Sequence, residues 1–207
     1  MQKLLRDSRH LVARHPFLEL SPTTEVDVGL AQSRHLGRLA DIANREIPGV
    51  DITADRLARF LVNDPEAIFV FQRHGRVIGG IAFLYLNERG HDALILDDIE
   101  LKNPALEFLA PAGEPVSAIY AWALAGYGRA VIGLGNVVAY HRRARFAGAD
   151  YFAAPATPAG RDLLQALGFQ PTPSFQPELW TYPRTPAAPG GVVSEPPAPG
   201  VSHHVHA

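Results

Sequence analysis

Two stretches in the second half of the chain decide the fold: ALAGYGRA at residues 123–130 and TPAGRDLLQALGF at residues 157–169. The first follows an apolar run, and its two glycines favour a tight turn. The second opens on Thr157, a residue type that caps helices, and reaches Gly168, which is typical of a helix end. Together they predict a strand, a glycine turn, a helix, a strand and a second helix. That order outlines a pocket for a phosphorylated ligand.

The composition indicates one globular domain with a real core. The chain has 207 residues, of which 47% are hydrophobic and 19% are charged. The formal net charge is −2, from 19 basic and 21 acidic residues. This balance gives none of the overall positive field that nucleic-acid binding usually requires, so we expect no nucleic-acid partner.

The absence of cysteine excludes disulfides, thiolate metal sites and cysteine nucleophiles. No signal peptide or membrane span is visible, so we expect a cytoplasmic protein with no membrane partner. Residues 1–21 are interpreted as a helical N-terminal extension. Residues 184–207, rich in Pro, Gly and Ala, are interpreted as a disordered tail. Three histidines near the tail's end could suggest a metal, but an unordered tail lacks fixed ligand geometry, and we expect no metal.

Residues 22–183 read as one α+β domain. In the first half, hydrophobic spacing predicts a strand over 22–30, a helix over 33–46 capped by Ser33, and a helix opened by Thr53 and closed at residues 64–65. Strands over 67–72 and 77–86 flank the turn RHGR and predict a hairpin. Gly79 and Gly80 in the second strand mark a bulge or close packing.

In the second half, a short strand is predicted over 93–101 and another over 116–124. A helix is predicted over 129–147, ending at Gly148, and a strand over 150–156. The helix that Thr157 caps carries Pro158 in its first turn, where the missing N–H costs nothing. A last strand is predicted over 177–182.

This order of elements resembles the GCN5-related N-acetyltransferases (GNAT) over residues 22–182. The resemblance implies a mixed, mostly antiparallel central sheet flanked by helices. It also implies acetyl-CoA or another acyl-CoA as co-substrate.

The cofactor turn of that family runs Gln/Arg-x-x-Gly-x-Gly/Ala, and Ala123, Gly126 and Gly128 fall on its fixed positions. Ala123 stands where the family has a cation or an amide, and Arg129 could supply the missing charge. Backbone N–H groups at such a turn would hold the pyrophosphate of acyl-CoA. A tight strand-to-helix turn with no ligand is the alternative. The resemblance gives these cofactor-binding candidates: Trp122, Ala123, Leu124, Gly126, Tyr127, Gly128, Arg129, Ala130 and Thr157.

The second family motif runs Asn-x-x-Ala-x-x-Leu-Tyr-x-x-x-Gly-Phe. Its positions fall without insertion on Thr157, Gly160, Leu163, Leu164, Gly168 and Phe169. The family tyrosine often protonates the departing thiolate, and Leu164 cannot donate a proton. Thr157 either hydrogen-bonds as the family asparagine does or serves only as a helix N-cap.

The catalytic candidates are Glu100, Asp98 and Tyr127. The family's general base usually comes from a neighbouring strand, and alternation along the predicted strand 93–101 puts Asp98 and Glu100 on one face and Asp97 on the other. A solvated edge position is the alternative for these carboxylates. Tyr127 is a candidate replacement for the missing acid.

Other polar and aromatic residues have two interpretations each. Tyr120 and Trp122 share a strand face, either as core or as the lining of an acceptor or acyl pocket. Tyr140 is a second candidate replacement acid. His141 opens the basic segment HRRAR, residues 141–145, which either favours a helix C-terminus or contacts the 3′-phosphate of coenzyme A.

We therefore predict an acyl-CoA-dependent N-acyltransferase that transfers an acyl group, acetyl in the first instance, directly to an unknown small-molecule or peptide amine. One alternative is a catalytically degenerate GNAT-fold module that binds a ligand or a protein. Another is an acyltransferase with an acyl carrier protein as donor, docked by Arg142, Arg143 and Arg145. A homodimer is the candidate assembly.

Overall fold

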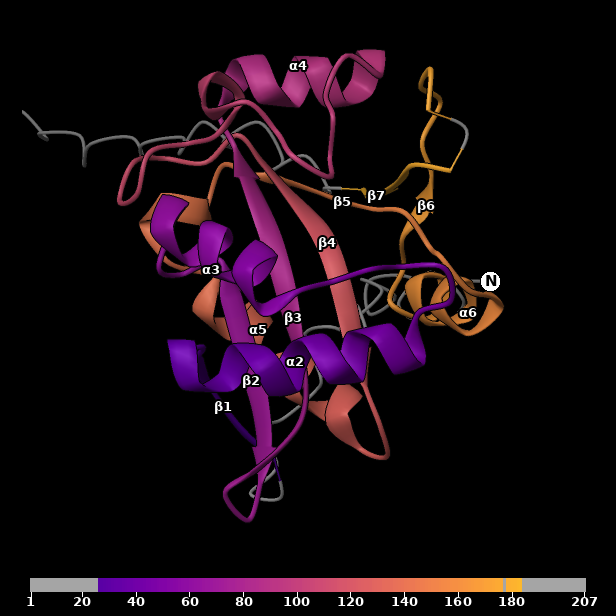
Figure 1. Cartoon of the computed structure of the whole chain (residues 1–207). Helices are drawn as coiled ribbons and strands as arrows, with labels where there is room; N and C mark the ends of the chain where they lie inside the picture. The colour runs from indigo at the N-terminus through magenta and orange to yellow at the C-terminus, as the bar shows by residue number, and fades with distance from the viewer. Residues whose placement is uncertain (1–25, 177, 184–207) are drawn as a thin grey trace, which may run out of the picture.

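The computed structural model describes residues 26–176 and 178–183, and these form a seven-stranded sheet in the order β1-β2-β3-β4-β5-β7-β6 (Figure 1). Every neighbouring pair is antiparallel except β4 and β5. The strands are β1 Asp27–Leu30, β2 Ile68–Arg73, β3 Arg76–Leu86, β4 Ala118–Gly126, β5 Asp150–Ala153, β6 Gln170–Pro171 and β7 Trp180–Tyr182. The predicted mixed, mostly antiparallel sheet is confirmed.

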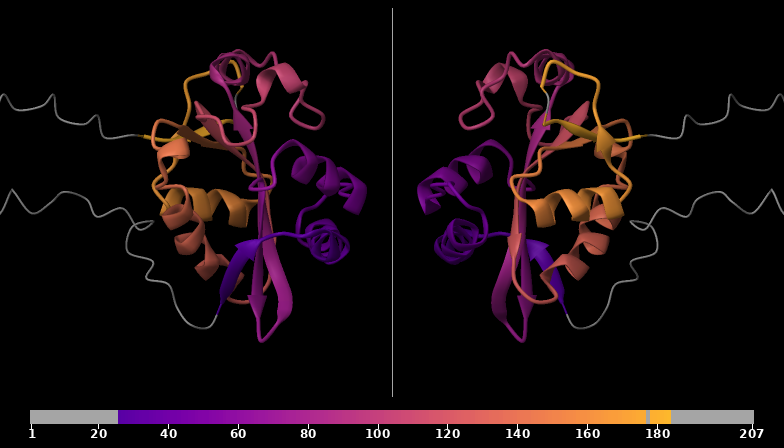
Figure 2. Two further views of the ribbon diagram at one scale, coloured as in Figure 1. Left: turned by 90° about the vertical axis from the view of Figure 1, so that its left-hand side faces the viewer. Right: turned by 90° about the vertical axis from the view of Figure 1, so that its right-hand side faces the viewer.

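Helices cover both faces of the sheet, as the edge-on views in Figure 2 show. On one face lie α2 and α3, and on the other lie α5 and α6. A further helix, α4, sits at the end of the sheet where β3 finishes (Figure 1). The helix bounds are α2 Ser33–Glu46, α3 Ala54–Asn63, α4 Glu88–Leu96, α5 Leu134–Tyr140 and α6 Pro158–Ala166.

The first half of the domain follows its sequence pattern closely. The predicted bounds 33–46 match α2, and Thr53 caps α3 by accepting a hydrogen bond from the Arg56 amide at 3.1 Å. One detail was wrong, because Gln32, not Ser33, is the N-cap of α2. The backbone amide of Gln32 donates a hydrogen bond to Nδ1 of His35 at 3.0 Å. The β2–β3 hairpin is confirmed as well. Its turn residues His74 and Gly75 both have positive φ, which suits a type I′ turn.

The glycine pair in β3 serves both predicted purposes. The register between β2 and β3 shifts beside Gly79, which marks a bulge. A Cβ on Gly79 would lie 2.6 Å from the Ala125 carbonyl oxygen, and one on Gly80 would lie 2.5 Å from the Phe69 carbonyl oxygen. Glycine at both positions therefore lets β2, β3 and β4 approach closely.

Two predicted elements were wrong. Residues 93–101 are not a strand: they contain the end of α4 and a loop, because Asn87 caps α4 and Asp97 ends it with φ 63°. A short apolar run such as Ala93–Leu96 fits a strand or a helix equally, and the flanking caps decide. The predicted helix over 129–147 is three pieces instead, a 3₁₀ turn Ala130–Gly133, α5, and a 3₁₀ turn Ala144–Phe146.

The remaining predictions concern the last strands and helix of the domain and the two ends of the chain. Strand β5, helix α6 and strand β7 lie inside the predicted ranges. The expected N-terminal extension and C-terminal tail fall outside the described residues, as do residues 22–25 of the first strand. No helix within residues 26–176 and 178–183 has the length and apolar character to cross a membrane.

Candidate functional site

The parallel strands β4 and β5 pair over four residues and then separate. Their partners run from Ala118 with Asp150 to Ala121 with Ala153, where β5 ends. Strand β4 continues to Gly126, so in the described part of the chain this edge of β4 has no strand partner beyond Ala121. Crevices at the carboxyl ends of parallel strands are common ligand sites in sheets of this kind.

A β-bulge lies at the point of separation. Ala121 pairs with Phe83 and Ala123 with Ala82, so Trp122 is the extra residue of β4. A bulge bends its strand and increases the local twist, and the pairing of β4 with β5 ends one residue before it. The Trp122 ring lies 4.7 Å from the Phe60 ring of α3, and its Nε1 donates to the Leu101 carbonyl at 2.8 Å. The indole is therefore fixed on the α3 side of the sheet.

The two glycines of the turn after β4 have different roles. A Cβ on Gly126 would lie 2.6 Å from the Ala130 Cβ and 3.2 Å from the Gly79 Cα, so close packing requires glycine there. Gly128 has φ 63°, and a Cβ on it would meet no atom within 4 Å. The Gly128 backbone therefore borders open space, as contact with an incoming group requires.

The structure places the predicted cofactor-binding residues in two groups. Trp122, Ala123 and Leu124 lie where β4 is no longer paired with β5, and residues 126–130 form the turn that follows. Thr157 follows β5 and caps α6, accepting a hydrogen bond from the Gly160 amide at 2.9 Å. The N-cap interpretation of Thr157 is thus confirmed.

Tyr127 is directed away from the strand separation. Its hydroxyl accepts from Arg38 of α2 at 2.8 Å and donates to the Val77 carbonyl of β3 at 3.3 Å. Because β3 and β5 flank β4 on opposite sides, this hydroxyl lies on the side away from β5. The geometry gives Tyr127 no place as the acid toward a group bound between β4 and β5.

The predicted carboxylates lie on a loop, so the shared-face prediction for Asp98 and Glu100 was wrong. Both residues are exposed. Asp97 ends α4, and its Oδ1 accepts from Gln176 Nε2 at 2.6 Å. Glu100 keeps one connection to the site, since the next residue, Leu101, accepts the Trp122 hydrogen bond.

Motif comparison missed a polar network that joins the end of α3 to the segment after α5. Arg145 forms ion pairs with Asp64 and, at 2.5 Å, with Glu66. Glu66 also accepts from the Arg143 guanidinium at 2.7 Å and from the Tyr140 hydroxyl at 2.6 Å. Arg145 and Asp64 are almost fully buried. No sequence pattern predicted this network, because Arg145 lies about eighty positions from Asp64 and Glu66 in the chain.

The network sets the pKa of Glu66 and hence part of the acid stability. Burial alone would raise the pKa of this carboxyl, but hydrogen bonds from Tyr140, Arg143 and Arg145 outweigh burial and lower it to about 2. A carboxyl with a depressed folded-state pKa stabilises the fold above its unfolded pKa, near 4.5. We therefore expect this stabilisation to fade as the pH falls from about 4.5 toward 2.

The pH prediction is tested by comparing thermal unfolding of the wild type and Glu66→Gln between pH 2.5 and 6.5. The wild type should be more stable than the variant at pH 6.5, by about 3 kcal/mol at most, and the two curves should converge at the acid end. A difference that stays constant over the whole range would contradict the assigned pKa.

His141 is buried in an aromatic cluster with Phe69, Phe83, Tyr85 and Phe146. Its Nε2 lies 3.0 Å from the Tyr85 hydroxyl, which donates to the Glu66 carbonyl. Burial, and then the nearby Arg143, lower the pKa of His141 to about 3, so the imidazole is neutral. The alternative in which His141 contacts the 3′-phosphate of coenzyme A is wrong, since the His141 side chain is buried.

Two of the three arginines of the alternative carrier-protein docking surface are engaged in this network. Arg143 and Arg145 are held by Glu66 and Asp64, which leaves Arg142 as the member of the trio outside this network. Tyr140, the second candidate acid, also belongs to this network. Burial and the hydrogen bond to Glu66 raise the pKa of its hydroxyl to about 12. The candidate site is therefore the open edge of β4 with the turn at 126–130.

Similar architectures occur among solved structures. The GNAT-like decarboxylase GphF, solved with isobutyryl-CoA, superposes with a TM-score of 0.51 at 14% identity, over 69% of this chain and 72% of that one. The chain has the GNAT fold. This result confirms the resemblance at the level of fold.

Other GNAT-fold structures superpose less closely. Ard1 from Thermoplasma volcanium gives a TM-score of 0.48 at 12% identity, over 76% of this chain and 95% of that one. Naa50 from Arabidopsis thaliana, in complex with the bisubstrate analogue CoA-Ac-MVNAL, gives 0.46 at 13% identity, over 76% and 95%. No protein-family model and no curated protein sequence matches the chain.

Proposed function

We propose that the protein is an acyl-CoA-dependent N-acyltransferase whose donor lies along the open edge of β4. One observation carries the proposal: the parallel pairing of β4 with β5 stops at the Trp122 bulge, while β4 runs on to the glycine turn. A pantetheine arm offers amides that can pair with such an edge, and Gly128 leaves space for a pyrophosphate beside it.

The chain would act mainly through its backbone and one cation. An N–H group on the open edge of β4 would polarise the thioester carbonyl, as donors preorganised for a developing oxyanion do. Arg129 adds positive charge at the turn, next to the place proposed for the pyrophosphate. With the thioester held on this edge, a neutral amine forms a bond to the carbonyl carbon while the carbon–sulfur bond breaks. The sulfur keeps the bonding electron pair, and the amine proton passes to solvent.

Two side chains considered for proton transfer are poor acids. Leu164 of α6 cannot donate a proton, and burial raises the pKa of Tyr120 to about 12, which makes its hydroxyl a weak acid. A thiol of ordinary pKa, about 8.5, can leave as a thiolate without a proton. These observations keep the second candidate open: a GNAT-fold module that binds a ligand or protein without catalysis.

Calorimetry with acetyl-CoA and a thiol-release assay over a panel of small-molecule and peptide amines separate the two candidates. The proposal predicts saturable binding and thiol release that depends on at least one amine. Binding with release at background for every amine would favour the binding module. No binding at millimolar acetyl-CoA would overturn the proposal and leave a module that binds another ligand or a protein.

A further inference from the structure

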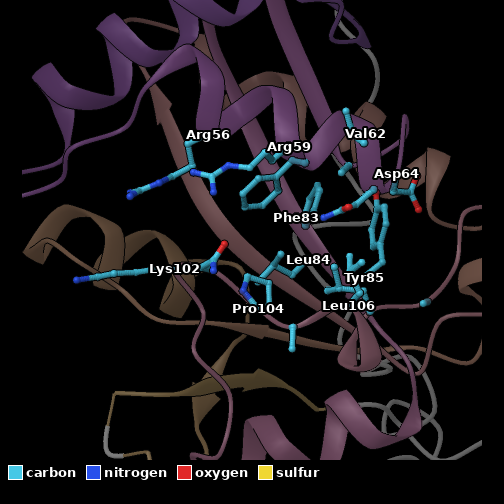
Figure 3. Close-up of a pocket in the computed structure, with 17 residues that line it drawn as sticks. Arg56, Arg59, Val62, Asp64, Phe83, Leu84, Tyr85, Lys102, Pro104 and Leu106 are labelled. Carbon is cyan, nitrogen blue, oxygen red and sulfur yellow. The ribbon is translucent and has the colours of Figure 1, made fainter.

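A pocket of about 470 Å³ lies outside the proposed donor site, between α3, the end of β3 and the loop 102–110 (Figure 3). It exists because β3 is longer than its neighbour. Strand β2 starts opposite Ala82, whereas β3 runs on to Leu86, where the chain around Leu109 takes over the edge. The volume is in the range of small-molecule sites.

The inner wall and part of the rim of this pocket are apolar. Phe60, Phe83 and Leu84 are buried and line the inside. At the rim, Val62 is 84% exposed and Leu106 is 70% exposed, which places them among the most exposed large apolar side chains of the described residues. A ligand with an apolar part would cover this surface, and burial of apolar area favours binding.

Three cations stand at the same rim. Arg56 and Arg59 lie one turn apart on α3, and Lys102 comes from the loop opposite (Figure 3). Among the described residues none of the three forms an ion pair. The acidic group lining the pocket is Asp64, whose charge is balanced by Arg145. The pocket therefore combines an apolar interior with an uncompensated positive rim.

We propose that this pocket binds an amphiphilic anion, an alkyl chain that carries a carboxylate or phosphate head. The chain would lie against Phe60 and Leu84 and under Leu106, and the head would meet Arg59 and Lys102, with Arg56 beside them. Charge complementarity selects this ligand over a neutral or cationic one of the same length. The proposal does not depend on acyl transfer.

Calorimetry on the full chain with dodecanoate, dodecyl phosphate and dodecanol tests the proposal. At least one of the two anions should bind more tightly than dodecanol, and the comparison of the two anions identifies the preferred head. In Arg59→Glu/Lys102→Glu, anion binding should weaken about ten-fold or more. The matched control Arg45→Glu/Arg76→Glu makes the same charge change at exposed sites outside the pocket and should bind nearly as the wild type does.

A second variant tests the apolar half. Leu106→Ser changes an exposed side chain, so folding should be retained, and all three probes should bind more weakly. The proposal would be overturned if neither anion bound more tightly than dodecanol, or if anion binding were unchanged in Arg59→Glu/Lys102→Glu. Acetyl-CoA binding should be unaffected in this double variant, which separates this result from a failure of the proposed function.

Discussion

Replacing Arg145 with methionine should lower the free energy of unfolding by about 3–5 kcal/mol, a large share of the stability of a domain this size. The guanidinium bridges Asp64 and Glu66, and removing it leaves the buried Asp64 carboxylate without its partner. Methionine fills similar volume, so the loss reports charge compensation more than packing. Urea unfolding at pH 7 measures the effect.

Arg161→Met is the control for this result. Arg161 pairs with Glu178 at 3.4 Å, and both side chains are more than half exposed. Exposed pairs of this kind contribute between about 0 and 1 kcal/mol, so the control should unfold almost as the wild type does. If Arg145→Met cost no more than Arg161→Met, the network would not hold the end of α3 against the segment after α5.

The second large effect is expected at Gly128. Among residues with a side chain, asparagine and aspartate best tolerate its φ of 63°. A Cβ there would meet open space. Gly128→Asp should weaken acetyl-CoA binding by roughly 30-fold, about 2 kcal/mol, because a carboxylate would face the pyrophosphate. Calorimetry at low salt gives the dissociation constants.

Gly128→Asn isolates the charge. Asparagine has nearly the shape of aspartate and the same tolerance for positive φ, so it should bind acetyl-CoA within a few-fold of the wild type. The difference between the two variants should shrink as salt is added, since salt screens exposed charges. Equal affinities of the two variants for acetyl-CoA at low salt would contradict the placement of the pyrophosphate at this turn.

The sequence predicted most of the sheet, because its signals there are local. The hairpin follows from β-rich runs around a turn with a glycine, and α6 follows from Thr157 and Pro158. The range 93–101 was wrong for a local reason as well. The short apolar run 93–96 fits a strand or a helix, and the caps then decide between them.

The candidate site was predicted in part. The glycine turn and the part of β4 beyond its pairing with β5 lie together because they are contiguous in sequence. The bulge at Trp122 depends on the register with β3, and the pocket near Arg59 depends on a loop folding back onto β3. Both require contacts between distant residues, which periodicity and motifs do not encode.

The most direct test of the central claim is an amide chemical-shift titration of the ¹⁵N-labelled protein with acetyl-CoA. If the donor lies along β4 with its pyrophosphate at the turn, the amides of Ala123, Leu124, Gly128 and Arg129 should shift most, in a saturable way. The amides around Arg59 and Lys102 should stay near their free positions. Shifts confined to that second region, or none at millimolar ligand, would contradict the account.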